Sequence, residues 1–137
     1  MYGKTFSTLG KMLDPISQDS CAFYERTAIF ADYDGVANGP DEGINIAKAL
    51  GDKEFCILQN HGILTTGSMV DTAVWYFLNM EDACKSQLLA EAVGEPKIIP
   101  HETACATRDY VANDLSAYVS FQPTIDVLWE EEPDLLD

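Results

Sequence analysis

The chain has 137 residues, 47% of them apolar and 23% charged, which is the composition of one globular domain of ordinary size. Its 23 acidic and eight basic residues give a formal net charge of −15, which repels phosphate backbones and anionic lipid surfaces. We therefore expect neither nucleic acid nor a membrane as a partner.

The cysteines are scattered along the chain, without the C-x-x-C spacing of a zinc ribbon or a redox motif. We expect them to be buried thiols. They are Cys21, Cys56, Cys84 and Cys105. Apolar runs long enough to span a bilayer are missing from the sequence, so we expect a cytoplasmic location.

The first half of the chain predicts a strand followed by a helix. The β-branched and aromatic run of residues 27–33 is typical of a strand. Turn residues, a proline and early acids over residues 38–42 predict the start of a helix that ends near Gly51. The apolar residues of this helix recur at helical spacing, so its apolar face carries Ile44, Ala47 and Leu50.

Two short apolar runs, residues 54–59 and 63–66, have the length of strands, and Asn60-His61-Gly62 connects them. A histidine on such a connection is held at a sheet end, where a ligand or a general base is well placed, and Gly62 permits a positive φ. Asn-x-Gly is also ordinary turn chemistry, and from residue types alone an exposed histidine without a function is the simpler interpretation.

A long helix is predicted over residues 68–93, with Ser68 and Asp71 as a capping box and Gly94 at its end. Two further helices follow from Glu102, with a break near residues 113–114. The class is therefore mixed α/β. The apolar stripe of the long helix is predicted to contain Val70, Ala73, Val74, Phe77, Met80, Ala83, Cys84 and Leu88, and its aromatic residues Trp75, Tyr76 and Phe77 are expected to pack in the core.

The two histidines, His61 and His101, have no Cys or His at metal-ligand spacing beside them, so the chain by itself has no three-histidine zinc site. His101 precedes a helix and is interpreted as a surface or capping residue without a role. No nucleophile elbow and no phosphate-binding glycine loop is present, and the carboxylate pairs do not assign acid/base chemistry.

Three segments in this order resemble the class II aldolase/adducin family: residues 2–7, 16–24 and 57–67, of which the last contains Asn60-His61-Gly62. The similarity continues through the long helix. It implies a three-layer α/β/α domain with a mostly antiparallel central sheet, usually assembled as a tetramer. In catalytic members a divalent metal, generally zinc (Zn²⁺), polarises a carbonyl during aldol cleavage of sugar phosphates.

The resemblance also assigns a metal ligand. The family holds its metal with a His-x-His pair and a later histidine, and only the later one is carried over, onto His61. The pair precedes a Ser-x-Tyr-Gly segment in relatives, whereas this chain begins Met1-Tyr2-Gly3. We therefore expect an N-terminally truncated domain over residues 1–128, followed by an acidic tail over residues 129–137.

The resemblance implies that the chain alone is not catalytically competent, because one imidazole does not replace a three-histidine site. Its expected partners are further copies of itself or a complementing N-terminal half, and a small carbonyl substrate if it is active. The alternative is a non-catalytic, adducin-like module for oligomerisation and actin-associated cytoskeletal interaction. Adducins carry a basic C-terminal tail, whereas this tail is acidic, which favours the lyase-type interpretation.

Overall fold

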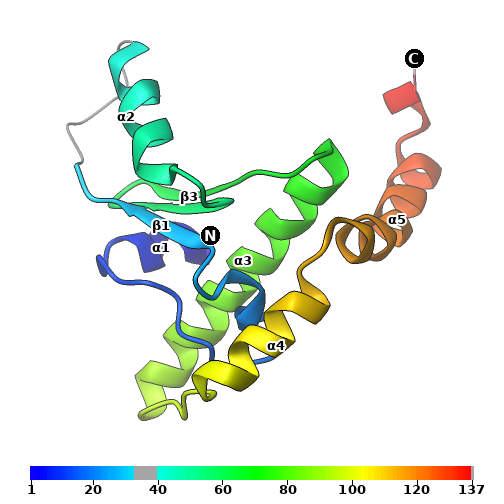
Figure 1. The fold of residues 1–137 in the computed structure, drawn as a ribbon. Coiled ribbons are helices and arrows are strands. Elements are labelled where there is room, and N and C mark those ends of the chain that lie inside the picture. Colours follow the sequence, from blue (N-terminus) through cyan, green and yellow to red (C-terminus); the bar gives the residue numbers. More distant parts are fainter. Residues whose placement is uncertain (33–39, 137) are drawn as a thin grey trace.

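The computed structural model describes residues 1–32 and 40–136 and confirms the α/β class (Figure 1). Within the described residues, no helix has the length and apolar character that crossing a membrane requires. The elements, in chain order, are α1 (Tyr2–Ser7), the 3₁₀ helix η1 (Ser20–Phe23), β1 (Thr27–Phe30), α2 (Pro40–Leu50), β2 (Phe55–Leu58), β3 (Gly62–Thr65), α3 (Val70–Val93), α4 (His101–Val111), α5 (Asp114–Glu131) and the 3₁₀ helix η2 (Pro133–Leu136).

The described strands form a sheet in the order β1-β2-β3, with β1 parallel to β2 and β2 antiparallel to β3. The expectation of a mostly antiparallel sheet is therefore wrong for the described strands, because the sheet is mixed. The physical reason is the length of the connections. The link from β1 to β2 contains α2 and is long enough for a parallel crossover, whereas the short turn from β2 to β3 forces an antiparallel pair.

Strand β1 ends earlier than the predicted strand over residues 27–33. Phe30 pairs with Leu58, the last residue of β2, and the backbone N–H of Gln59 then donates to the carbonyl of Phe30 at 2.9 Å. Ala31 and Asp32 lie outside the ladder and are exposed. Tyr33 and the first part of the predicted turn, residues 38 and 39, lie outside the described residues.

Helices cover both faces of the sheet, as Figure 1 shows with α2 on one side and α1 and α3 on the other. Alternate side chains of β2 point to opposite faces. Phe55 and Ile57 join the larger core, whereas Cys56 and Leu58 join a smaller one beneath α2. The larger core contains Phe6, Leu13, Ala22, Phe23, Phe55, Ile57, Tyr76, Met80, Ala83, Cys84 and Ala117.

The predicted apolar face of α2 is confirmed for Leu50 and is wrong for Ile44 and Ala47. Ile46, Ala49 and Leu50 pack against the smaller core, whereas Ile44 is 50% exposed and Ala47 is exposed. Both the predicted and the observed residues recur at helical spacing, so the sequence pattern alone does not decide which side of this short helix faces the sheet. Contact with Cys56 and Leu58 of β2 selects the rotation that is observed.

Helix α3 begins at Val70, two residues later than predicted, and it is not capped by Ser68 and Asp71. The hydroxyl of Thr72 accepts a hydrogen bond from the N–H of Met69 at 3.2 Å and donates to the carbonyl of Met69 at 2.8 Å. The predicted capping box is therefore wrong. The Thr72 side chain, and not that of Asp71, is hydrogen-bonded to Met69, the residue before the helix.

The end of α3 is confirmed, since the N–H of Gly94 donates to the carbonyl of Ala90 at 3.0 Å. Its apolar stripe is confirmed only in part. The later members pack in the core, whereas Val70 is 79% exposed and Val74 is 37% exposed. The buried side of the helix is made of Thr72, Tyr76, Met80, Ala83, Cys84 and Gln87.

Arg26 ties three separate segments together. Its guanidinium donates to both carboxylate oxygens of Glu54, at 2.9 and 2.6 Å, and to the backbone carbonyl of Ala112 at 2.8 Å. It also lies over the rings of Phe55 and Tyr76, 5.3 and 5.7 Å from their centroids. The hydrogen bonds with Glu54 raise the pKa of Arg26, so the guanidinium stays charged in this partly buried position.

Replacing this guanidinium should destabilise the fold. We expect Arg26→Ala to lower the free energy of unfolding by about 2–3 kcal/mol, because three charge-assisted hydrogen bonds are lost and the carbonyl of Ala112 loses its donor. Urea denaturation followed by circular dichroism measures the loss. The control is Lys53→Ala, which removes an exposed pair with Asp52 at 3.8 Å and should cost at most about 1 kcal/mol. Equal losses in the two variants would contradict this interpretation.

Candidate functional site

His61 lies on the tight turn between β2 and β3, as the sequence predicts. Asn60 has a φ of +61° and Gly62 a φ of +156°, so both residues adopt conformations that asparagine and glycine tolerate best. The N–H of His61 donates to the carbonyl of Leu58 at 2.9 Å, and the N–H of Asn60 donates to the carbonyl of Ser7 at 3.3 Å. The turn is thus fastened to the end of α1, and the His61 side chain is exposed at the end of the sheet.

The surroundings of His61 do not form a metal site on their own. Among the described residues, His61 belongs to no group of three His, Cys, Asp or Glu side chains whose ligand atoms lie within 4.8 Å of one another. A catalytic zinc requires three protein ligands in fixed geometry. The described part of the chain therefore offers His61 as a single ligand and does not fit a complete metal centre at this turn.

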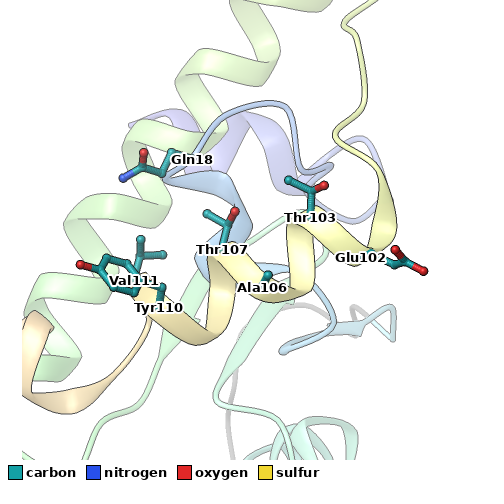
Figure 2. A pocket seen from close by; sticks show the side chains of 7 residues that line it. All are labelled: Gln18, Glu102, Thr103, Ala106, Thr107, Tyr110 and Val111. Carbon is teal, nitrogen blue, oxygen red and sulfur yellow. The ribbon is translucent and has the colours of Figure 1, made fainter.

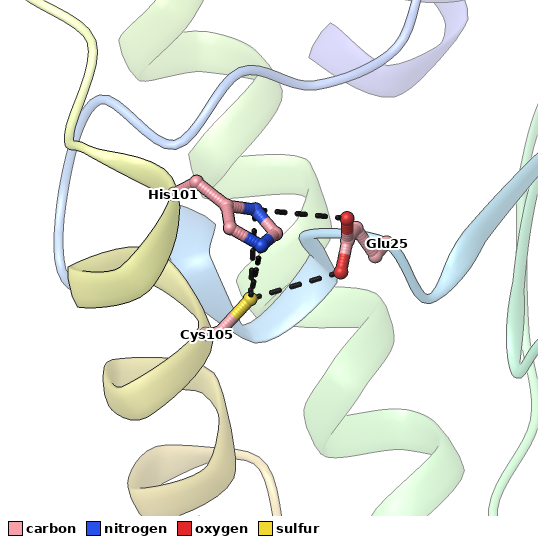
Figure 3. A group of neighbouring side chains, drawn as sticks. All are labelled: Glu25, His101 and Cys105. Carbon is pink, nitrogen blue, oxygen red and sulfur yellow. Dashed lines mark hydrogen bonds and ion pairs between the residues drawn. The ribbon is translucent and has the colours of Figure 1, made fainter.

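A different cluster does bring three such side chains together: Glu25, His101 and Cys105 (Figure 3). The sulfur of Cys105 lies 3.8 Å from both ring nitrogens of His101 and 3.7 Å from Oε2 of Glu25. Nδ1 of His101 lies 3.7 Å from Oε1 of Glu25 and 3.2 Å from the hydroxyl of Tyr24. The cluster joins the first turns of α4 to the segment between η1 and β1.

This cluster was not predicted from the sequence. His101 is exposed at the start of α4, in agreement with its interpretation as a surface residue. The expectation that no cysteine stands at metal-ligand spacing beside it is wrong, because Cys105 follows four residues later on the same face of α4. The spacing of four residues between His101 and Cys105, at the start of a predicted helix, was the sequence feature that could have indicated this pair of ligands. Glu25 was beyond sequence reasoning, since only the packing of α4 against η1 brings it there.

The prediction of buried thiols is confirmed for three cysteines, Cys21, Cys56 and Cys84. Burial raises the pKa of the Cys84 thiol to about 12, and it also raises the pKa values of Cys21 and Cys56. These thiols therefore stay protonated at neutral pH. Cys105 differs, because it is only partly buried and faces other polar side chains.

The pKa of the Cys105 thiol is raised overall, although its surroundings act on it in opposite directions. Loss of solvent contact raises the pKa of its thiol first, the positive charge of Arg108 lowers it, and the carboxylate of Glu25 raises it again. Arg108 lies 3.3 Å from Oε2 of Glu25 and 2.8 Å from the carboxylate of Asp109. Its hydrogen bond to Asp109 raises the pKa of Arg108, which remains a fixed positive charge at the edge of the cluster.

An open pocket of about 550 Å³ lies along another face of α4 (Figure 2). Neither histidine lines it. Glu102 and Tyr110 are its ionisable lining residues, and they do not form an acid/base pair with a nucleophile or a metal-ligand set. The full lining is Gln18, Glu102, Thr103, Ala106, Thr107, Tyr110 and Val111.

Residues 1–88 match the family profile described as "Class II Aldolase and Adducin N-terminal domain". Decarboxylase NovR of Streptomyces niveus is 37% identical over 135 residues, which cover 98% of this chain and 50% of NovR. Alpha-adducin of Rattus norvegicus is 34% identical over 100 residues, covering 71% of this chain and 13% of the adducin. The chain thus spans about half the length of the first of these relatives.

The fold agrees with the sequence match. The structure of L-fuculose 1-phosphate aldolase from Glaciozyma antarctica PI12 superposes with a TM-score of 0.88 at 38% sequence identity, covering 98% of this chain and 50% of that one. The resemblance seen in residues 2–7, 16–24 and 57–67 is thereby confirmed. The matching profile, the related sequences and the shared fold show that this chain belongs to the class II aldolase and adducin family.

Proposed function

We propose that this chain is part of a class II aldolase-type lyase domain in which His61 is one ligand of a divalent metal, and that the chain alone does not catalyse aldol cleavage. The observation that carries the proposal is the placement of His61. The imidazole is exposed at a sheet end, on a turn held by two backbone hydrogen bonds, and the described residues add no further ligands there.

The incomplete ligand set limits the chemistry. Zinc in a catalytic site takes three protein ligands and keeps one position open. His61 supplies one of them, so no catalytic step follows from the described residues. The remaining ligands would come from beyond the described residues, for example from a complementing chain. A small phosphorylated carbonyl compound is the substrate class that the named aldolase structure supports.

The second candidate function is a non-catalytic, adducin-like interaction module. It is favoured by an exposed apolar stripe on α3, formed by Val70, Val74 and Leu78 at successive helical turns. Phe77 and Thr65 border the same stripe in an apolar depression.

The chain alone should not cleave L-fuculose 1-phosphate above background, with or without added Zn²⁺, and His61→Ala should not change this result. A coupled assay of aldehyde release measures the rate. His101→Ala is the matched control, since it also removes one exposed imidazole. Zinc-dependent cleavage that disappears in His61→Ala and persists in His101→Ala would overturn the proposed incompetence, because it would require a metal site completed within or between copies of the chain.

The ligand role of His61 is tested separately in a chimera that joins this chain to the part of NovR outside the matched region. Divalent metal should then bind at the completed site with an affinity that His61→Ala lowers at least about tenfold and Lys53→Ala, at a position remote from any histidine, leaves unchanged, if His61 is a ligand of that site. Unchanged affinity in His61→Ala would remove His61 from the site. Calorimetric titration of metal into the chimera measures both values.

The exposed stripe on α3 should cause self-association. Burying one such valine in the contact stabilises the oligomer by about 1.5 kcal/mol. Val74→Glu should therefore raise the dissociation constant of the oligomer at least about tenfold. Light scattering over a range of concentrations measures it, with Val93→Glu as the control, because Val93 is exposed at the far end of the same helix. A monodisperse monomer at all concentrations would count against association.

A further inference from the structure

We propose that Glu25, His101 and Cys105 form a binding site for one zinc ion, separate from the position of His61. The site is built from one carboxylate oxygen, one imidazole nitrogen and one sulfur, all within 4.8 Å of one another. It does not depend on the proposed lyase-type function, because none of its residues lies on the β2–β3 turn.

The spacing of the ligand atoms matches tetrahedral coordination. Zinc bonds of about 2.0–2.3 Å at tetrahedral angles place sulfur, nitrogen and oxygen ligands about 3.3–3.6 Å apart. The separations in the cluster are 3.7 Å from Sγ of Cys105 to Oε2 of Glu25, 3.8 Å from Sγ to Nε2 of His101 and 3.7 Å from Nδ1 of His101 to Oε1 of Glu25. One ligand atom from each side chain lies within 4.8 Å of the other two, and rotations of the exposed Glu25 and His101 side chains would bring all three into bonding positions around one ion.

The ligand types select the class of metal. A thiolate with an imidazole and a carboxylate suits zinc, whereas magnesium and calcium require oxygen ligands only. Two of the ligands are held by one rigid element, since His101 and Cys105 lie one helical turn apart on α4. Three protein ligands leave the fourth position open to water or to a ligand molecule.

The neighbours of the cluster orient the ligands. The hydroxyl of Tyr24 lies 3.2 Å from Nδ1 of His101, and the two rings meet edge to face at 5.8 Å. With Nδ1 bonded to Tyr24, Nε2 is the ring nitrogen left free to coordinate the metal, and both nitrogens lie 3.8 Å from the sulfur of Cys105. Glu25 has a φ of +60°, an uncommon conformation outside glycine, and this backbone directs its carboxylate toward α4.

The charges balance on binding. The thiol of Cys105 releases its proton to solvent, and the thiolate and the Glu25 carboxylate together neutralise the two positive charges of the ion. Arg108 is bound to Asp109 and to Oε2 of Glu25, so Oε1 is the Glu25 oxygen that is free to coordinate. The net charge of −15 raises the local concentration of cations around the whole chain.

Metal titration of the purified chain, after removal of bound ions with a chelator, tests the site. We expect one equivalent of Zn²⁺ to bind, and we expect Co²⁺ to produce the thiolate-to-cobalt charge-transfer absorption that reports a Co–S bond. Cys105→Ala should abolish that absorption, and His101→Ala and Glu25→Gln should each weaken zinc binding at least about tenfold. All three side chains are exposed or partly exposed, so these variants should keep the fold.

His61→Ala is the matched control, since it removes the other exposed histidine and should leave the affinity and the cobalt spectrum unchanged. The proposal is overturned if the folded chain binds no Zn²⁺ at micromolar concentrations, if bound Co²⁺ lacks the thiolate absorption, or if His61→Ala rather than His101→Ala removes the metal. Circular dichroism of each variant confirms that the comparison is made between folded chains. Loss of metal in His61→Ala would place the ion at the family's position instead, which separates this proposal from the preceding one.

Discussion

The pairing of Arg26 with Glu54 is the interaction on which the arrangement of the other parts depends. The guanidinium connects the start of β1 to the start of β2 and, through the carbonyl of Ala112, to the junction of α4 and α5. Glu25 is its chain neighbour, and α4 ends at Val111. The same contact, together with the packing of α4 against η1, holds α4 beside the segment that carries Tyr24 and Glu25, and so helps to bring Glu25, His101 and Cys105 together.

The position of His61 depends on a different chain of contacts. The backbone of Asn60 binds the end of α1 through Ser7, and both carboxylate oxygens of Glu81 on α3 accept the N–H groups of Tyr2 and Gly3 at the start of α1. A short helix such as α1 is marginal by itself, so the carboxylate at its positive end stabilises it. The turn that carries the imidazole is thus held in place by α3 acting through α1.

Family membership shows the fold of this chain, but it does not show which metal chemistry the chain supports. The close superposition with an aldolase structure shows the fold, but a fold hosts several functions, and the relatives of this chain include a decarboxylase and an adducin. The metal chemistry depends on how many ligands converge. At His61 the described residues supply one ligand, whereas at Glu25, His101 and Cys105 they supply three. The more complete ligand set is therefore not the one that the family resemblance indicates.

The sequence by itself determined the local features: the two apolar runs around Asn60-His61-Gly62, the end of α3 at Gly94, the break before α5, and the family. Each of these depends on short-range periodicity or turn chemistry that residue types express directly. Only the tertiary structure decided that β1 runs parallel to β2, that α2 packs Ile46 rather than Ile44 against the sheet, and that Glu25 meets His101 and Cys105. The reason is physical, because these outcomes come from packing between residues far apart in the chain, where local spacing is compatible with more than one arrangement.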